Sequence, residues 1–175
     1  GSAEASSKYG GFNQPHMVAV DRNGNIYVVD VSNHRVQKFS SNGTFVGWIG
    51  ARVDGSVTVG WSQIGAPAES SKLGGFNRPV SVQLVDGATA SQDLIIVADL
   101  RNYRVQKFSA DGRFAGWLGG KADGGVTAGW ETQGEPRQGS EPGAFASPYD
   151  ARMHNGKLYV VDKDNKRVQV FHLSN

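Results

Sequence analysis

The chain has 175 residues, with 18 lysines and arginines against 16 aspartates and glutamates, so its formal net charge is only +2. That length supports a single domain, and without any run of basic residues we expect neither a nucleic-acid partner nor a membrane partner. Cysteine is absent, which excludes disulfides, thiolate metal sites and a cysteine nucleophile but leaves the compartment unknown.

Residues 1–11 precede the first strand signal and are expected to be a lead-in segment. Gly1-Ser2 resembles an expression scar, which leaves open whether a native leader was removed. The sequence AEASSKYGGF, which ends at Phe12, nearly copies the AESSKLGGF that ends at Phe76. The chain therefore begins with what resembles the end of a connection between repeats.

The segment 12–50 contains four short runs of alternating or β-branched residues that predict strands. Turn sequences rich in Asp, Asn, Ser and Gly separate the runs and favour tight hairpins. The predicted strands are Met17 to Val20, Asn25 to Val29, Arg35 to Phe39 and Thr44 to Ile49. Four antiparallel strands joined in sequence order form a meander.

The same pattern returns in segments 76–119 and 145–175, and such self-similarity is the signature of a repeat architecture. Three consecutive four-stranded meanders predict the blades of an all-β propeller, so residues 12–175 are expected to form one propeller domain. The repeats begin at Phe12, Phe76 and Phe145, a spacing well above the roughly 40 to 50 residues usual for a blade.

Two insertions, 51–75 and 120–144, account for the extra length and share the pattern D-G-x-V-T-x-G-W. Long loops in a compact domain are usually either functional or disordered. Because both insertions keep the same internal motif, disorder is the less favoured alternative.

The first repeat resembles the NHL repeat, because Asn33, His34 and Arg35 fall on the signature of that family. The other copies depart from the signature at its middle position, which is Tyr103 in the second and Lys166 in the third. The resemblance covers about three quarters of the chain. It implies a β-propeller, usually six-bladed, that serves as a binding platform. It also admits an enzyme, since the family includes a metal-dependent lyase.

An aspartate, an asparagine and an arginine recur at the same turn of every repeat, beginning with Asp30, Asn33 and Arg35. A catalytic site is rarely needed three times over, so we interpret this set as structural. The asparagine is expected to cap the turn and the arginine to pair with an aspartate.

Three blades do not close a ring, since propellers have about four to eight blades. A second copy would complete a six-bladed ring, so we expect a homodimer with two-fold symmetry. The alternatives are a piece of a longer array and a minimal or engineered propeller fragment whose only property is assembly. The third repeat also lacks a counterpart of the fourth strand, which predicts an unpaired edge.

Topology predicts one shared surface for the insertions, the Asp-x-x-Asn turns and the starts of the innermost strands. Trp61 and Trp130 lie in the insertions and are candidates for stacking on a ligand at that surface. An insertion also needs an anchor, and packing of these two tryptophans against the blades is the interpretation we favour.

The innermost strands follow three prolines and should begin at the mouth of the central channel. The candidate binding residues at these positions are His16, Met17, Ser81, Tyr149 and Asp150. Asp150, Arg152 and His154 alternate along one predicted strand, and an ordinary hydrogen-bonded network is the favoured interpretation of that trio.

The resemblance implies one further possibility at the mouth, because the family's lyase places Pro-His there in several blades and binds zinc. Only Pro15-His16 reproduces that dipeptide, since Val80 and Tyr149 follow the other two prolines. His16 is therefore a candidate ligand of a divalent metal, zinc or calcium, with Tyr149 and Asp150 as oxygen donors. No cofactor is the favoured expectation, because zinc needs about four ligands.

The sequence thus favours a non-enzymatic binding or scaffold module that recognises a protein, a peptide or a glycan on the insertion face. The alternative is a metal-dependent lyase or hydrolase with its site in the channel near His16.

Overall fold

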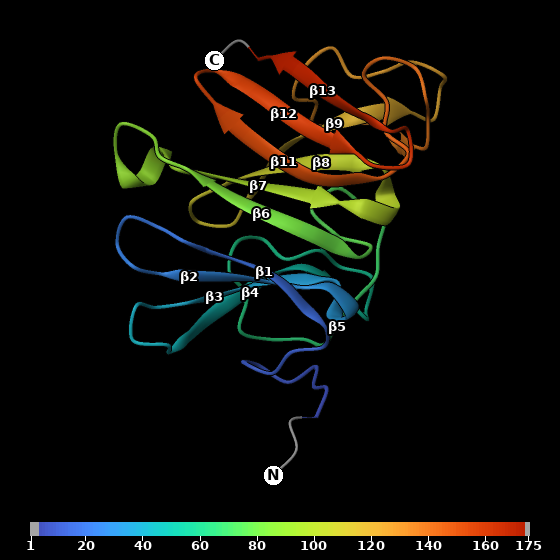
Figure 1. The fold of residues 1–175 in the computed structure, drawn as a ribbon. Helices are drawn as coiled ribbons and strands as arrows, with labels where there is room; N and C mark the ends of the chain where they lie inside the picture. The colour runs from blue at the N-terminus through green and yellow to red at the C-terminus, as the bar shows by residue number, and fades with distance from the viewer. Residues whose placement is uncertain (1–3, 174–175) are drawn as a thin grey trace.

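The repeats fold as three antiparallel sheets stacked in chain order, with blade 1 lowest and blade 3 highest in Figure 1. This computed structural model describes residues 4–173, so the predicted scar at Gly1-Ser2 lies outside the described residues. The described residues contain strands and three single-turn 3-10 segments but no α-helix. The predicted all-β architecture of antiparallel, propeller-like blades is confirmed.

Blade 1 is the sheet β1–β2–β3–β4–β5, in which neighbouring strands are also neighbours in sequence. Its strands are β1 (Pro15–Val20), β2 (Ile26–Asp30), β3 (Arg35–Phe39), β4 (Phe45–Arg52) and β5 (Pro67–Ala68). The one-turn segment η1 (Val31–Asn33) connects β2 to β3. β4 continues to Arg52, two residues beyond the predicted end of the blade, because the first insertion turns back and pairs with it.

Blade 2 repeats this arrangement with strands β6 to β10, and η2 (Ala90–Gln92) and η3 (Leu100–Asn102) lie in its turns. The strands are β6 (Pro79–Val85), β7 (Leu94–Asp99), β8 (Arg104–Ser109), β9 (Phe114–Lys121) and β10 (Pro136–Arg137). The short strands β5 and β10 come from the two insertions. Each insertion therefore adds a fifth, two-residue strand to the predicted four.

Blade 3 contains only β11 (Pro148–His154), β12 (Lys157–Asp162) and β13 (Arg167–His172). Within the described residues no strand pairs with the outer edge of β13, as the sequence predicts. The predicted blade 145–175 extends two residues beyond the part of the chain that the structure describes.

The hydrophobic core lies between the blades. One layer joins blade 1 to blade 2 through residues such as Val29, Ile49 and Val97. A second layer joins blade 2 to blade 3 through residues such as Leu118 and Val160. Burial of each such side chain contributes roughly 1.5–3 kcal/mol, so the stack is held together mainly by these two layers.

The core brings the three innermost strands side by side, with β6 in contact with both β1 and β11. Each innermost strand begins at a proline that stands opposite the aspartate of the adjacent turn, as in the pair Pro15 and Asp30. The start of the innermost strands and the Asp-x-x-Asn turns are therefore at the same end of the blades. No helix within residues 4–173 has the length and apolar character needed to cross a membrane.

Candidate binding site at the channel mouth

A β-bulge follows each of the three prolines that begin the innermost strands. The register of pairing shifts between Pro15 and Val18, and the same shift follows Pro79 and Pro148. An extra residue in a strand redirects the local side chains. The side chains of the residues after the prolines therefore do not follow the regular alternation between the two faces of the sheet. We refer to His16, Met17, Tyr149, Asp150 and Arg152 together as the mouth cluster.

His16 is exposed and lies against blade 2. Its Nδ1 is 2.8 Å from the carbonyl oxygen of Val80. A carbonyl oxygen can only accept, so Nδ1 carries the proton of the neutral ring and Nε2 keeps its lone pair. The hydroxyl of Tyr149 lies 3.4 Å from that Nε2, although 133 residues separate the two in sequence.

Tyr149 places its ring between two other side chains of the mouth. Its ring centroid is 5.7 Å from that of His16, and the rings are nearly perpendicular at 88°. The ammonium of Lys163 lies over the Tyr149 ring at 5.1 Å from the centroid, within the range of a cation–π contact. Blade 3 therefore presents an aromatic face with a cation above it.

Arg152 and Asp150 form an ion pair at 3.0 Å between Nε and Oδ2. The same guanidinium donates to the sulfur of Met17 at 3.1 Å, which connects blade 3 to blade 1. His154 is exposed near the hairpin at the far end of β11. The structure thus joins Asp150 and Arg152 of the predicted trio, while His154 stands apart from them.

Ser81 lies two residues after the proline of β6, the position that Met17 holds in β1 and Asp150 in β11, but it is fully buried. Its hydroxyl oxygen has no hydrogen-bond partner among the described residues. Ser81 is therefore out of reach of a ligand at the surface.

The mouth does not fit a zinc ion of the kind that the family resemblance implies. Nowhere in residues 4–173 do three or more histidines, cysteines or acidic residues gather as metal ligands. His16 is the only imidazole of the mouth cluster, and the carboxylate of Asp150 is already paired with Arg152. A tetrahedral zinc site needs about four such ligands. One chain therefore supplies too few donors.

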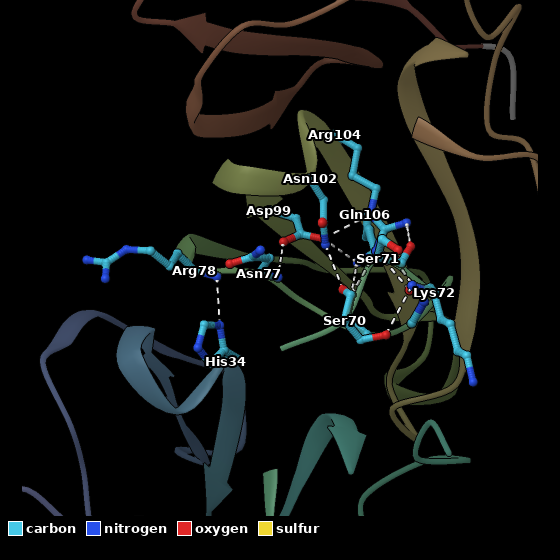
Figure 2. A network of polar contacts seen from close by, with 12 residues as sticks. His34, Ser70, Ser71, Lys72, Asn77, Arg78, Asp99, Asn102, Arg104 and Gln106 are labelled. Atoms are coloured by element: carbon cyan, nitrogen blue, oxygen red, sulfur yellow. Dashed lines mark hydrogen bonds and ion pairs between the residues drawn. The ribbon is translucent and has the colours of Figure 1, made fainter. Parts of the chain in front are cut away.

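A second polar cluster, the turn network, lies beside the mouth and is drawn for blade 2 in Figure 2. Asp99 Oδ2 accepts hydrogen bonds from Asn102, Arg104 and Gln106 at 2.8–3.0 Å. The other carboxylate oxygen accepts from the backbone N–H of Asn77. Burial raises the pKa of Asp99, while the charge of Arg104 and the amide of Asn102 act in the opposite direction.

The turn network fastens the connection that leads into its blade. Arg104 donates to the carbonyl oxygens of Ser71, Lys72 and Gly75, all at 2.9 Å. Arg35 in blade 1 and Arg167 in blade 3 make the same set of bonds to their own lead-in segments. Threefold repetition of one bonding pattern shows that the network supports the fold, as the sequence predicts.

His34 joins the turn of blade 1 to blade 2, because its Nδ1 accepts a hydrogen bond of 3.1 Å from the backbone N–H of Arg78. Figure 2 shows this contact at the boundary between the two blades. Burial lowers the pKa of His34, since the charged ring would lose water, and the neutral ring is the form that can accept.

The insertions follow the outer edges of the blades. Trp61 Nε1 donates to the carbonyl oxygen of Ala110, in the β8–β9 turn, at 3.0 Å. Its ring contacts Tyr27 and lies under the ammonium of Lys38 at 5.4 Å. The β8–β9 turn is at the opposite end of β8 from Arg104 and the turn network. The expectation that Trp61 shares one surface with the mouth is therefore wrong.

Trp130 repeats this anchoring role in the second insertion. It packs against the core between blades 2 and 3, and Lys107 lies over its ring at 5.0 Å. Trp117 forms an isolated bridge with Glu131, which holds this part of the insertion against strand β9. The favoured interpretation of both tryptophans, packing against the blades, describes the contacts that the structure shows.

Lys163 is the mouth residue that sequence reasoning missed. It follows Asp162 at the position held by Val31 in blade 1 and Leu100 in blade 2. The change from an apolar residue to lysine in one copy alone was a signal available in the sequence.

Comparison with known proteins identifies the repeats. The family model described as "NHL repeat" matches residues 12–39. The chain is an NHL-type propeller. "Peptidyl-glycine alpha-amidating monooxygenase B" of Xenopus laevis is 32% identical over 162 residues, which cover 90% of this propeller chain and 15% of that protein.

A second relative, from Caenorhabditis elegans, is "Probable peptidyl-alpha-hydroxyglycine alpha-amidating lyase pgal-1", which is 33% identical over 57% of this chain and 23% of its own length. The propeller chain thus spans less than a quarter of either relative. Among solved structures, an auxiliary nutrient binding protein from Bacteroides thetaiotaomicron matches with a TM-score of 0.55 and 12% identity. That match covers 87% of this chain and 36% of the other, and it concerns the fold alone.

Proposed function

We propose that this propeller is a non-enzymatic binding module that takes a peptide, or an extended segment of a protein, at the channel mouth. An NHL-type propeller is a scaffold on which such sites are commonly built. The observation that carries the proposal is the meeting of His16 and Tyr149 at the start of the innermost strands, across 133 residues of sequence.

The chemistry of the mouth suits a peptide. His16 Nε2 can accept from a peptide N–H, and the Tyr149 hydroxyl can donate to a carbonyl. The ammonium of Lys163 lies over the Tyr149 ring and favours a carboxylate on the ligand. Arg152, which is bonded to Asp150 and Met17, lies at the same mouth. Two relatives carry names that refer to peptidyl-glycine or peptidyl-hydroxyglycine, and this supports a peptide over a glycan.

Selection from a displayed library of random peptides tests this proposal. We expect the wild-type chain to enrich a defined pool, and the selected peptides to bind Tyr149→Ala and Arg152→Ala at least about tenfold more weakly. Arg113→Ala is the matched control, because Arg113 is exposed in the β8–β9 turn at the opposite end of the blade. Equal binding to all three variants, or no enrichment, would contradict a peptide site at the mouth.

The amidating relatives favour a second candidate, an enzyme that acts on modified peptides. A peptide ending in α-hydroxyglycine, incubated with the protein and added zinc, would separate the two functions. Conversion to the C-terminal amide, detected by mass and lost in His16→Ala, would displace the binding module. An unchanged peptide mass is the result that our proposal predicts.

A further inference from the structure

The outward face of blade 3 carries four exposed apolar side chains in two cross-strand pairs. Tyr159 pairs with Val170, and Val161 pairs with Val168. Their exposed fractions are 36%, 48%, 39% and 59% respectively. Contiguous apolar patches of this kind on a soluble protein mark sites of association.

Blade 1 carries a second open face at the other end of the stack. Val18 pairs with Val28, and Val20 pairs with Ile26. Val18 and Val20 are each 60% exposed. The two ends of the molecule therefore each expose two cross-strand apolar pairs.

The boundaries inside the chain show what such faces pack against. Where blade 1 meets blade 2, each side contributes two cross-strand pairs to one buried layer. Blade 1 contributes Tyr27 with Lys38 and Val29 with Val36; blade 2 contributes Val82 with Val97 and Leu84 with Ile95. The boundary between blades 2 and 3 is built in the same way.

The open faces occupy the positions of these buried pairs in the repeat. Counted from the turn aspartates Asp30 and Asp162, Tyr159 and Val161 of blade 3 correspond to Tyr27 and Val29 of blade 1. In the same way, the open pairs of blade 1 correspond to the pairs of blade 2 that lie against blade 1. Each open face is thus the half of an interface whose other half lies at the opposite end of the same chain.

One substitution makes the third strand of blade 3 more apolar on this face than its counterparts in blades 1 and 2. Lys38 and Lys107 hold the third-strand position in blades 1 and 2, where each lies over an insertion tryptophan. In blade 3 that position is Val170. Covering this position therefore requires no desolvation of an ammonium group.

We propose that two copies of this chain associate head to tail, with blade 3 of each copy on blade 1 of the other, and close a six-bladed ring. Two contacts related by a two-fold axis satisfy both open faces of both copies. Three copies would give nine blades, outside the usual range of about four to eight. This proposal is argued from the blade faces alone, although Arg152 of the mouth cluster pairs with Tyr159 and so lies on the same face of blade 3.

Sedimentation velocity over a dilution series tests the association with one variant of each face. The wild type should sediment as a species of 37.4 kDa, twice the 18.7 kDa of one chain. Val170→Glu and Val18→Glu each place a glutamate in both contacts of a symmetric dimer and should weaken association at least about 100-fold. Val59→Glu is the control, because Val59 is 77% exposed on the first insertion, and it should dimerise as the wild type.

An equimolar mixture of Val170→Glu and Val18→Glu tests the head-to-tail arrangement itself. One of the two contacts of the mixed dimer carries both glutamates, and the other is unchanged. The mixture should therefore associate at least about tenfold more tightly than either variant alone.

Three results would overturn the proposal. A wild-type monomer of 18.7 kDa would exclude association, and larger open polymers would exclude closure. If Val18→Glu dimerised as tightly as the wild type while Val170→Glu did not, the blade 3 faces would pack on each other. All three valines are exposed, so we expect every variant to fold. Circular dichroism spectra of Val18→Glu and Val170→Glu that match the spectrum of Val59→Glu would show that a loss of association is not a loss of folding.

Discussion

The turn network and the mouth cluster lie at the same end of the blades, but the first is repeated in every blade and the second occurs once. Asp30, Asp99 and Asp162 each hold an asparagine, an arginine and a lead-in segment in the same way. The positions after the prolines are instead filled by His16, Val80 and Tyr149. Repetition identifies residues that build the blade, and departure from repetition identifies residues available for binding.

The largest effect is expected from removing a charge of the turn network. Asp99→Asn would leave the guanidinium of Arg104 buried without its counter-charge, at a cost of about 3–5 kcal/mol in the free energy of unfolding. The matching change in blade 3, Asp162→Asn, should cost only about 1–3 kcal/mol, because the Arg167 side chain is 27% exposed and water can replace the lost partner. Urea unfolding measures the loss of unfolding free energy in both variants.

Equal losses in these two variants would contradict the view that burial of the arginine decides the effect. Losses of unfolding free energy near zero in both variants would show that the turn network does not contribute to stability.

The insertion tryptophans should give a smaller effect that differs between the two copies. Trp61→Phe removes the hydrogen bond to Ala110 and should cost about 1 kcal/mol. Trp130→Phe should cost less, since no acceptor for its indole N–H lies among residues 4–173. Thermal unfolding of the two variants side by side distinguishes them, and the reverse order would show that the two anchors are not arranged as described.

His34 makes the first blade boundary sensitive to pH. Its pKa is lowered in the folded state, so the folded state binds fewer protons than the unfolded state between that pKa and about 6.5. The stability contribution of this residue is therefore complete above the unfolded pKa and is lost as the pH falls. His34→Gln, which cannot titrate, should flatten the unfolding free energy between pH 7 and pH 5. An unchanged pH profile would contradict a neutral His34 at this boundary.

The smallest change in stability is expected at the mouth. His16 and Tyr149 share a contact of 3.4 Å at the surface, so His16→Ala and Tyr149→Ala should each alter the unfolding free energy by less than about 0.5 kcal/mol. Loss of peptide binding without loss of stability would separate the mouth from the scaffold. A cost of several kcal/mol would instead make this pair part of the scaffold.

The repeated parts of the molecule are the parts that could be predicted from the sequence. Strands such as Arg35–Phe39 were predictable because alternation and turn residues are local signals, and the role of Asp99 was predictable because three copies point to one explanation. The path of Trp61 was not predictable, since an insertion that folds back along β4 leaves no periodic signal. The meeting of His16 with Tyr149 depends on the bulges after the prolines and on the reach of the two side chains across β6. Neither feature can be inferred from the sequence of a single blade.

The position of the ligand on the propeller is the most direct test of this account. Amide, imidazole and indole signals of the isotope-labelled protein would be followed by NMR during titration with a selected peptide. We predict shifts for His16, Tyr149 and Arg152, while the indole N–H signals of Trp61 and Trp130 stay in place. Shifts of those two indole signals with an unchanged mouth would contradict the account and place the ligand on the insertions.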